Sequence, residues 1–472
     1  MTNLSALLIE HPFADDQALL YGPDTSLTAG QARAQSSALA GQLGELGVAA
    51  GMPVAVILDG VEMVVAMHAV WLAGGVFVPV NTRLPQAGRD EIVEQTRPAA
   101  VIDEHGVQAV EGTPTVHPPG TGFVLWTSGT TGRPKAVLHT HDAYLELLDR
   151  VLAPLRGRAT SDPAKRPTPN LIPVSMALNA GIYNSLFGLR AGAALVLLDR
   201  FSPTAFADAV ATHQITSSVL PPAAMVMLSE AADAGKITTL APLRYIRSIT
   251  AALSPFQARR FTERFGVAVL NGYGQAEMGE VIGWTAAMSR EHPDKIGSIG
   301  RPHPGVEIRI DAPDGNGVGE LLVCPPNRAA GYADGHDLGD RVTADGFVRT
   351  GDMARIDDDG FVWIEGRAGD LINRGGNKIF PEEVEEVLAA VPGVVEAAVV
   401  PRPDDRLGEV PVAYVVIDPA HADPSSASFV TDDSLIAACR AALVPYKVPV
   451  AFERIDRLPR NEIGKLLRKQ LS

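Results

Sequence analysis

A short polar run that follows a predicted strand combines the residue types that bind phosphate. Residues 127–135 are Thr-Ser-Gly-Thr-Thr-Gly-Arg-Pro-Lys, and the apolar residues 123–126 before them predict a buried strand. Glycines let backbone N–H groups turn toward an anion, hydroxyls add donors, and Lys135 adds a positive charge. The run predicts a phosphate-binding loop, although such turns are also typical of ordinary surface loops. No Gly-Lys-Ser/Thr sequence follows, which excludes a P-loop NTPase.

Two later motifs offer groups suited to the rest of a nucleotide. In Tyr-Gly-Gln-Ala-Glu at 273–277, the glycine-flanked Tyr273 can stack on a base, and Glu277 can hold Mg²⁺ beside phosphates. In Arg-Thr-Gly-Asp at 349–352, the carboxylate of Asp352 can accept both ribose hydroxyls. Taken alone, the first motif is also typical of a strand-to-loop corner and the second of a hairpin turn.

Three motifs stand in the C-terminal part of the chain. They are Gly-Arg-Ala-Gly-Asp at 366–370, Asn-Arg-Gly-Gly-Asn-Lys at 373–378, and a Gly-Lys pair that ends at Lys465. Taken alone, these motifs are equally typical of an interdomain turn, an ordinary hairpin and a solvated surface lysine. Their order after the phosphate loop gives them more weight than any one has by itself.

In this order the motifs resemble the signature of the adenylate-forming superfamily, which comprises acyl- and aryl-CoA synthetases, peptide-synthetase adenylation domains and firefly luciferases. The resemblance covers residues 127–465, nearly the whole chain. It implies that ATP, Mg²⁺ and coenzyme A are used, that Glu277 holds the metal, and that the catalytic residues are Lys465, Glu277 and Thr127. It also implies a nucleotide-binding set of Thr127, Ser128, Gly129, Thr130, Thr131, Gly132, Lys135, Thr250, Ala251, Ala252, Asn271, Gly272, Tyr273, Gly274, Gln275, Ala276, Asp352 and Arg367.

The resemblance implies that the C-terminal motifs work by domain rotation. Gly369 stands where relatives carry Asp or Lys as a pivot, and glycine absorbs large φ/ψ changes without steric cost. Lys465 would neutralise the attacking carboxylate and the pentavalent transition state. After rotation, a pantetheine tunnel would be lined by Arg374, Gly375, Gly376 and Lys378.

The chain departs from the superfamily pattern at two places beside the nucleotide. Ala276 replaces the Thr or Ser whose hydroxyl contacts the α-phosphate, and Ser-Ile-Thr-Ala-Ala at 248–252 replaces a Gly-Gly-Ala-Pro run along the adenine. These departures motivate the hypothesis of a ligase that is impaired in adenylation and mainly forms thioesters from a preformed acyl-adenylate.

Residues 173–179, Pro-Val-Ser-Met-Ala-Leu-Asn, stand where relatives carry Phe-His or, for amino-acid activators, Phe-Asp. A buried α-ammonium group would need a carboxylate partner, and the absence of one here disfavours an amino-acid substrate. Small and apolar residues predict a roomy pocket for a bulky or long apolar acid, although close helix packing explains them equally well. The predicted acyl pocket consists of Met176, Ala177, Asn179, Ala180, Gly181, Ala223 and Gly274.

The elements that position these motifs follow from hydrophobic periodicity. Helices are predicted at residues 32–46, 61–72, 142–155, 179–189, 203–213, 381–391 and 433–443. Alternating with them, strands are predicted at 53–58, 76–80, 170–175, 194–199, 217–221, 243–250 and 267–271. From residue 305, short strands between Asp/Gly turns predict an antiparallel barrel or meander. The expected fold is α/β: a large domain (1–368) of two packed α/β sheets with a barrel-like subdomain, and a small mobile α+β domain (369–472).

Composition and charge limit the classes of partner and the expected location of the protein. The net charge of −15 disfavours nucleic acid and anionic membranes, and no apolar stretch suits a membrane span. Cys324 and Cys439 are far apart without metal spacing, and no signal peptide is evident, so a cytoplasmic protein is expected. His139 and His141 lack a third metal ligand in sequence.

The sequence thus predicts an AMP-forming acyl-CoA ligase whose substrates are a bulky or long apolar small-molecule carboxylic acid, ATP and CoA. Three alternatives stay open: the adenylation-impaired ligase, a free-standing adenylation enzyme that loads an acyl carrier protein, and a non-catalytic nucleotide-binding protein. The identity of the acid and the oligomeric state do not follow from the sequence.

Overall fold

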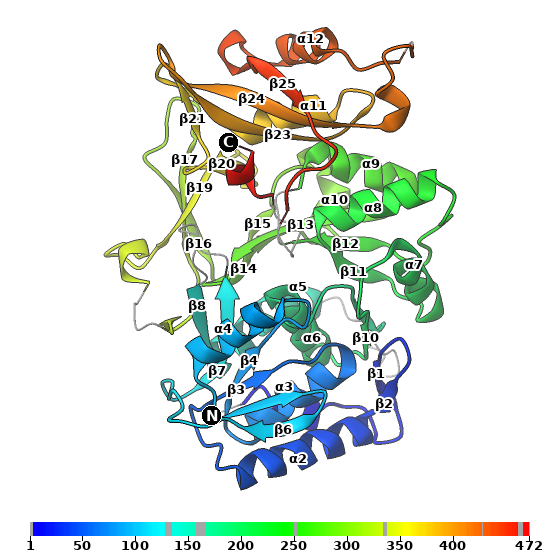
Figure 1. The fold of residues 1–472 in the computed structure, drawn as a ribbon, viewed down its shortest axis with the longest axis vertical. Helices are drawn as coiled ribbons and strands as arrows, with labels where there is room; N and C mark the ends of the chain where they lie inside the picture. The colour runs from blue at the N-terminus through cyan, green and yellow to red at the C-terminus, as the bar shows by residue number, and fades with distance from the viewer. Residues whose placement is uncertain are drawn as a thin grey trace.

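The structure is a computed structural model that describes residues 3–127, 135–156, 167–249, 253–333, 338–426, 428–460 and 466–471. Four sheets organise these residues (Figure 1). The N-terminal sheet and the C-terminal sheet lie at opposite ends of the molecule, with β13, β14 and β15 between them. No described helix is both long and apolar enough to cross a membrane.

The first sheet has seven strands in the order β18-β8-β7-β4-β3-β5-β6. Its central strands β3, β4, β5 and β7 are parallel, and β6, β8 and β18 pair antiparallel at its edges. The strands are β3 (Pro53–Val56), β4 (Val76–Pro79), β5 (Ala100–Asp103), β6 (Gly106–Ala109), β7 (Thr121–Thr127), β8 (Lys135–Thr140) and β18 (Gly331–Tyr332). The helices of this part are α1 (Ala6–Ile9), α2 (Ala29–Glu45), α3 (Gly60–Leu72) and α4 (Gln86–Thr96).

The second sheet has nine strands in the order β15-β14-β13-β12-β11-β9-β10-β1-β2 and is parallel from β1 to β13 through its centre. The strands are β1 (Ala18–Tyr21), β2 (Ser26–Thr28), β9 (Asn170–Ile172), β10 (Leu195–Leu197), β11 (Ser217–Leu220), β12 (Tyr245–Ser248), β13 (Ala268–Gln275), β14 (Gly279–Gly283) and β15 (Arg301–Pro302). Its helices are α5 (His141–Arg156), α6 (Asn179–Arg190), α7 (Pro203–Thr212), α8 (Pro222–Asp233), α9 (Pro255–Phe265) and α10 (Met288–Glu291), followed by a 3₁₀ turn, η1 (Pro293–Lys295).

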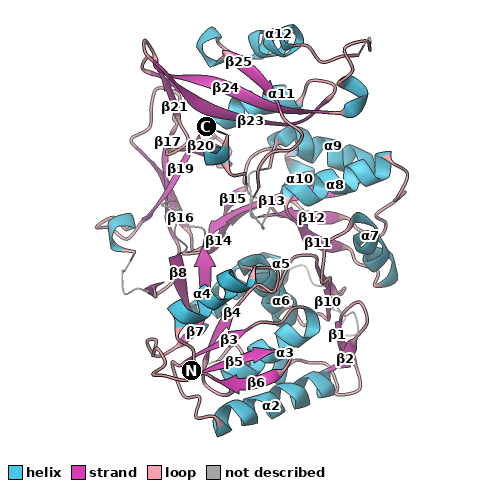
Figure 2. Cartoon of the chain, viewed as in Figure 1, coloured by secondary structure: helices cyan, strands magenta, loops and turns pink. Residues whose placement is uncertain are grey.

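Two mainly antiparallel assemblies follow, the second with one parallel strand pair (Figure 2). The third sheet, β16-β17-β19-β20, runs in chain order, so of the two predicted forms it is a meander. Its strands are β16 (Glu307–Asp311), β17 (Gly319–Cys324), β19 (Val348–Ile356) and β20 (Val362–Arg367), with η2 (Gly339–Arg341) before β19. The C-terminal sheet comprises β21 (Ile372–Arg374), β22 (Asn377–Ile379), β23 (Val394–Asp404), β24 (Gly408–Ile417) and β25 (Ala451–Arg454), with α11 (Pro381–Ala389), α12 (Asp432–Ala442), η3 (Pro419–His421), η4 (Pro445–Lys447) and η5 (Arg468–Gln470).

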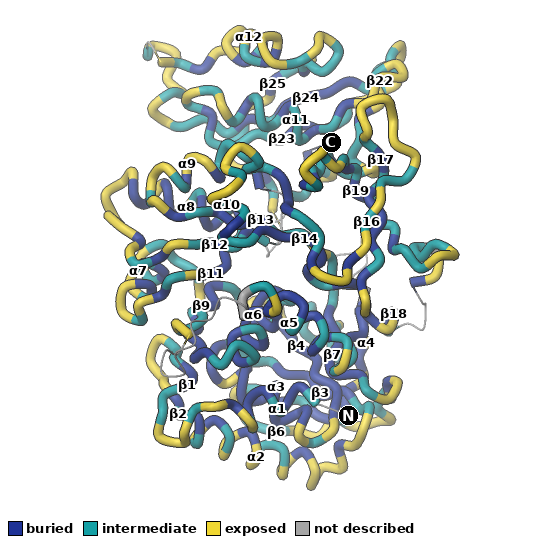
Figure 3. The backbone as a smooth tube through the Cα atoms, turned by 180° about the vertical axis from the view of Figure 1, so that it is seen from behind, coloured by how far each residue is buried: buried dark blue, intermediate teal, exposed yellow. Residues whose placement is uncertain are grey.

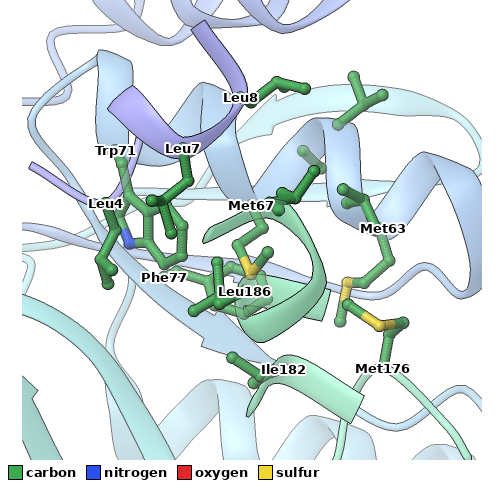
Figure 4. Close-up of a cluster of buried hydrophobic side chains, with 14 of the residues drawn as sticks. Leu4, Leu7, Leu8, Met63, Met67, Trp71, Phe77, Met176, Ile182 and Leu186 are labelled. Carbon is green, nitrogen blue, oxygen red and sulfur yellow. The ribbon is translucent and has the colours of Figure 1, made fainter. Parts of the chain in front are cut away.

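Helix α3 occupies the centre of the main core. Every residue from 60 to 71 of this helix except Glu62 is buried, which is typical of a helix covered on nearly every side. Asp59 caps its first turn by accepting a hydrogen bond from the Gly60 N–H. Apolar side chains of α1 and α6 pack against it (Figure 4), whereas α2 and α12 carry many exposed residues (Figure 3).

Strand β13 differs from its prediction in a way that matters for the site. The strand was predicted to end at Asn271 but extends to Gln275 because β14 pairs with it antiparallel. The register shifts between Tyr273 and Gly274, where a Cβ on Gly274 would lie 2.0 Å from the Gly279 carbonyl oxygen. Tyr273 and Gln275 are therefore strand residues with fixed directions rather than parts of a loop.

The first turn of α6 tests how tightly the chain packs beside the predicted acyl pocket. A Cβ on Gly181 would lie 2.2 Å from the Ser175 carbonyl oxygen. Gly181→Ala should therefore lower the free energy of unfolding by about 1–3 kcal/mol, measured by chemical denaturation. Gly41→Ala in α2, where a Cβ would meet no atom within 4 Å, is the control and should raise stability by up to about 1 kcal/mol. Equal effects at both positions would contradict the packing argument.

Candidate active site

The carboxylate of Asp352 on β19 lies at the centre of a hydrogen-bonded group from three strands. Its Oδ2 accepts a hydrogen bond of 2.5 Å from the Tyr273 hydroxyl and one of 3.1 Å from Gln275 Nε2, both on β13. Its Oδ1 lies 3.0 Å from Arg367 Nε on β20. Asp352 is only 4% exposed, so these partners replace water and fix the direction of the carboxylate. Burial and the neighbouring Asp352 raise the pKa of Tyr273 well above its usual value, so its hydroxyl remains a donor.

Glu277 belongs to the same network through an arginine. Its Oε1 accepts hydrogen bonds from Arg341 Nη1 at 2.7 Å and from the Tyr332 hydroxyl at 3.0 Å. Arg341 Nη2 also donates to Gln275 Oε1 at 2.6 Å, and Gln275 in turn donates to Asp352. A continuous chain of hydrogen bonds thus joins the two acidic residues that the sequence assigned to the metal and to the ribose.

Arg341 and Tyr332 were not predicted, because no local motif marks them. Arg341 lies in η2, and Tyr332 lies on β18, which pairs with β8 directly after the phosphate-loop segment. The Glu277 carbonyl oxygen accepts a hydrogen bond of 2.8 Å from the Ala329 N–H, close to the start of β18. Tertiary contacts of the edge strand therefore tie Glu277 to β8.

The geometry around Glu277 is compatible with a single-carboxylate Mg²⁺ site. Its Oε2 has no hydrogen-bond partner in the described ranges, and no group of three or more His, Cys, Asp or Glu in those ranges is arranged to hold a metal. Mg²⁺ commonly takes one or two carboxylates together with substrate phosphates and water. Glu277 fits that pattern as one ligand beside a nucleotide.

Several predicted nucleotide contacts lie outside the described residues. These are Ser128, Gly129, Thr130, Thr131, Gly132, Thr250, Ala251 and Ala252. Thr127 and Lys135, at the two ends of the phosphate-loop segment, are paired backbone to backbone as the last register pair of β7 and β8. Ser248, the last residue of β12, pairs with Asn271 on β13, two residues before Tyr273. The phosphate-loop segment thus lies between β7 and β8, and the segment at 250–252 comes shortly after β12 in the sequence.

The remaining β13 positions are shaped by small residues. A Cβ on Gly272 would lie 3.2 Å from Glu280 Oε1, and Gly274 is exposed at the register shift. Ala276 is half-buried and packs against a small apolar cluster that contains Val137 and Tyr332. Its methyl group therefore faces the interior where relatives are expected to carry a hydroxyl.

The predicted acyl-pocket residues divide between the core and α6. Met176 is 1% exposed and packs in the main core beside Met63 (Figure 4), and Ala177 packs against the same cluster. Asn179 Oδ1 accepts a hydrogen bond of 3.3 Å from the Tyr144 hydroxyl. Ala180 and Gly181 are buried in the first turn of α6, and Ala223 is half-buried at the start of α8. The acyl-pocket assignment remains a prediction.

Comparison with known proteins agrees with the geometry. The AMP-binding enzyme family matches residues 10–119 and 110–333, and the AMP-binding enzyme C-terminal domain matches residues 383–465. The chain belongs to the AMP-binding enzyme family. Its members are AMP-forming ligases, so the predicted enzyme class and superfamily are confirmed.

Named relatives place this AMP-binding enzyme in the acyl-CoA ligase branch. A sulfoacetate–CoA ligase from Cupriavidus necator is 33% identical over 417 residues, which cover 83% of this chain and 75% of the relative. A 2-succinylbenzoate–CoA ligase from Bacillus licheniformis is 30% identical over 508 aligned residues, covering 98% of this chain and 100% of the relative. The solved structure of o-succinylbenzoate CoA synthetase from Bacillus subtilis, in complex with its acyl-adenylate OSB-AMP, has a TM-score of 0.83 and 27% identity and covers 100% of this chain and 99% of that one.

The C-terminal sheet of the AMP-binding enzyme carries the predicted CoA-tunnel residues on the β21–β22 hairpin. Gly375 and Gly376 form its turn with φ of +57° and +89°, a region that favours glycine. Lys378 is exposed, whereas Arg374 Nη1 donates a 2.7 Å hydrogen bond to the Tyr446 carbonyl oxygen. Gly369 is exposed between β20 and β21, and a Cβ there would contact no atom within 4 Å. The hinge and tunnel assignments stay predictions.

An arginine anchors the C-terminal segment to this sheet. Lys465 lies outside the described residues, and Arg468 follows three positions later. Arg468 bonds to Glu385 on α11, to Glu382 Oε1 at 3.2 Å and to the Val399 carbonyl oxygen at 3.0 Å. It also lies 3.8 Å from Asp370, next to Gly369. The anchor thus connects the end of the chain with α11 and with the predicted hinge.

Glu382 in this anchor makes the stability of the C-terminal sheet depend on pH. Burial raises its pKa from 4.5 to about 7, although the Arg468 guanidinium opposes that shift. Because the folded pKa is raised, this contribution to stability is complete below about pH 4.5 and is lost as the pH rises through about 7. Glu382→Gln, neutral at every pH, should therefore lose less stability than the wild type between about pH 5 and pH 8.

Chemical unfolding followed at both pH values measures this difference. Glu453→Gln is the control, because Glu453 is an exposed residue of β25 outside the Arg468 contacts. A wild type and a Glu382→Gln variant with the same pH dependence would show that Glu382 does not hold its proton in the fold.

Proposed function

We propose that this enzyme is an acyl-CoA ligase that joins a carboxylic acid to CoA through an acyl-adenylate. The observation that carries the proposal is the hydrogen-bonded chain from Asp352 through Gln275 and Arg341 to Glu277, in a member of the AMP-binding family. That chain fixes the directions of two carboxylates, which supports the roles proposed for them in binding a nucleotide. ATP and CoA are substrates of AMP-forming CoA ligases.

The first half-reaction forms the acyl-adenylate. The carboxylate oxygen of the acid attacks the α-phosphorus of ATP, the bond to the bridging oxygen breaks, and pyrophosphate leaves. In this proposal Asp352 accepts the ribose hydroxyls, Tyr273 stacks on the adenine, and Thr127, Lys135 and the loop between them hold phosphates. Glu277 would hold Mg²⁺, which supplies positive charge to the phosphates.

The second half-reaction forms the thioester. The sulfur of CoA attacks the acyl carbonyl carbon, the bond to the phosphate oxygen breaks, AMP leaves, and the thiol proton passes to solvent. Activation as an adenylate replaces hydroxide with a much better leaving group. We propose that residues 369–472 form the moving domain, which withdraws Lys465 and brings Gly375 and Gly376 to the thiol.

For the acid itself we propose an apolar, bulky body. The small side chains of Ala177, Ala180 and Ala223 support this, because they take up little volume at or just before the first turns of α6 and α8. Gly181 does not add to this room, because it packs directly against the Ser175 carbonyl oxygen. The relatives named above act on sulfoacetate and on 2-succinylbenzoate, which are acids of different sizes. An acyl carrier protein in place of CoA is the alternative acceptor, and direct comparison of both acceptors in the second half-reaction distinguishes them.

A second candidate function rests on Ala276. Its methyl group packs against the cluster of Val137 and Tyr332, so no hydroxyl is available there for the α-phosphate. An enzyme impaired in adenylation would form thioesters from supplied acyl-adenylates more readily than from free acids. Acid-dependent exchange of pyrophosphate into ATP, followed beside thioester formation from synthetic acyl-adenylates, tests both candidates. Activity in neither assay, across aliphatic, aromatic and polycyclic acids, would overturn the proposed function.

Lys465 should matter for only one half-reaction. We expect Lys465→Ala to abolish acid-dependent pyrophosphate exchange, because the attacking carboxylate and the charged transition state lose their cation. Thioester formation from supplied acyl-adenylate should be spared. Lys469→Ala, in the same terminal segment, is the control and should leave both rates unchanged. Equal loss of both half-reactions in Lys465→Ala would refute the assignment.

Gly376 should show the opposite division. Gly376→Trp should reduce thioester formation strongly and leave pyrophosphate exchange intact, because the indole would block a narrow thiol channel. Gly376→Ala is the matched control: it introduces the same backbone strain at φ +89° without the bulk. If the two variants have equal thioester-forming rates, Gly376 does not line the path of the thiol.

A further inference from the structure

A buried charged cluster joins the predicted adenine strand to the predicted acyl-pocket helix. We call it the Glu280 cluster, and its members are Glu280, Arg247, Tyr183, His303 and Arg150. Glu280 Oε1 accepts hydrogen bonds from Arg247 Nη2 and from His303 Nε2, the latter at 3.1 Å. Its Oε2 accepts a 3.2 Å hydrogen bond from the Tyr183 hydroxyl.

The cluster lies beside Tyr273 on β13 and beside the first turns of α6. A Cβ on Gly272, the residue before Tyr273, would lie 3.2 Å from Glu280 Oε1. Tyr183 stands on α6 one turn after Asn179 and Ala180, so its ring lies along the same helix face. A substrate that reaches from Tyr273 toward α6 therefore meets the cluster.

Both carboxylate oxygens of Glu280 already have hydrogen-bond partners inside the protein. Its side chain is 7% exposed, and both oxygens are engaged by the three donors named above. Burial alone would raise the pKa of Glu280, but the Arg247 guanidinium and the hydrogen bonds from His303 and Tyr183 lower it to about 2. The carboxylate is thus ionised and satisfied within the protein.

Arg247, by contrast, has donors to spare. In the described part of the chain its one hydrogen bond is the Nη2 contact to Glu280, and a guanidinium carries five N–H donors. It lies on β12, between β11 and β13 in the nine-stranded sheet, yet its side chain is 21% exposed. Ile246 and Ser248, on the other face of β12, are fully buried. The Arg247 side chain therefore lies on the face of β12 opposite to Ile246 and Ser248 and remains partly accessible to solvent.

The surroundings favour an anionic partner. Arg150, whose side chain is 2% exposed, donates to the Glu280 carbonyl oxygen at 3.3 Å and lies 3.2 Å from the more exposed Glu146. Its Nε is buried with no hydrogen-bond partner in the described ranges. Two guanidinium groups therefore lie next to Glu280, Arg247 at its carboxylate and Arg150 at its backbone carbonyl oxygen, and their remaining N–H groups can only donate.

We propose that Arg247 binds a second anionic oxygen group, a carboxylate or a sulfonate, at the end of the acid remote from its reacting carboxyl group. A guanidinium can hold such a group through two parallel hydrogen bonds. The inference rests on the proposed function and deepens it: the acid has an apolar body and a distal anion. Arg247 is then a specificity residue that discriminates between dicarboxylates and monocarboxylates.

Matched acids test this substrate class. The panel pairs linear dicarboxylates from succinate to sebacate with monocarboxylates of the same length, with their neutral monoamides, and with acids that bear a terminal sulfonate. The wild type should prefer the dianionic acid of at least one length in kcat/KM for thioester formation, and the sulfonate arm shows which anion is favoured. A wild type that uses monocarboxylates as well as every dianionic acid would overturn the inference while leaving the proposed function intact.

Variants on β12 separate recognition from folding. Arg247→Met should lower kcat/KM for the preferred dianionic acid roughly 10- to 100-fold, chiefly through KM, and leave the matched monocarboxylate unchanged. The kcat/KM of Arg247→Lys for the dianionic acid should lie between those of the wild type and Arg247→Met. Arg244→Met, at an exposed position before β12, is the control. Arg247→Met removes the cationic partner of the buried Glu280 carboxylate. The double variant Arg247→Met/Glu280→Gln removes that negative charge as well and should show the same loss of discrimination. Equal losses for both acids would mean that Arg247 is only structural.

Calorimetric binding in the presence of a non-hydrolysable ATP analogue makes the test independent of turnover. Tight binding of a dianionic acid that Arg247→Met weakens, without any thioester formed, would uphold the inference and defeat the proposed function. If a wild type that forms thioesters binds dianionic and monoanionic acids with equal affinity, the inference is overturned and the proposed function is upheld.

Discussion

A carboxylate that leaves water must find all its hydrogen bonds inside the protein, and Asp352 meets this constraint with groups from neighbouring strands. Tyr273 and Gln275 reach it because β13 continues as a strand past Asn271, and Arg367 reaches it from the end of β20. The extension of β13 depends in turn on β14, which approaches so closely at Gly274 that no side chain would fit. The same strand pair holds Glu277 in its connecting turn and Glu280 on β14. The direction of each acidic group therefore follows from how β13 is paired.

Most helices with a continuous apolar stripe, and the strands between them, could be predicted from the sequence, but α8 was missed although seven of its residues are buried. Helices α4 and α9 could not, because only Thr96 is buried in the first and only Ala258 and Phe261 in the second. Strand β1 forms by pairing with β10, as in Leu20 with Leu195, and such distant pairing leaves no local pattern. The end of β13 was missed for a related reason: its glycines disfavour a strand until β14 supplies the partner.

The candidate site divides along the same line. Motif residues such as Tyr273, Glu277 and Asp352 could be singled out because their types and spacing suit a nucleotide. Arg341, Tyr332, Arg247 and Glu280 could not, because they come together only through η2, β18, β12 and β14. The prediction of an apolar acyl pocket was based on small residues along α6 and α8. Nothing in the sequence pattern places the charged cluster beside Tyr183. Charge partners that are distant in sequence are the part of a site that composition and spacing reveal least.

The anchor at Arg468 has a kinetic consequence. Because this residue contacts α11, the Val399 backbone and Asp370, it links the terminal segment to the C-terminal sheet that carries the β21–β22 hairpin. If the proposed hinge after β20 operates, the terminal segment and the hairpin would move together. In the proposed cycle, one domain rotation would then withdraw Lys465 and bring Gly375 and Gly376 to the CoA thiol. The withdrawal of Lys465 and the approach of the hairpin would then have the same rate. A substitution that speeds one of these movements would also speed the other. Solvent viscosity would slow both transitions alike.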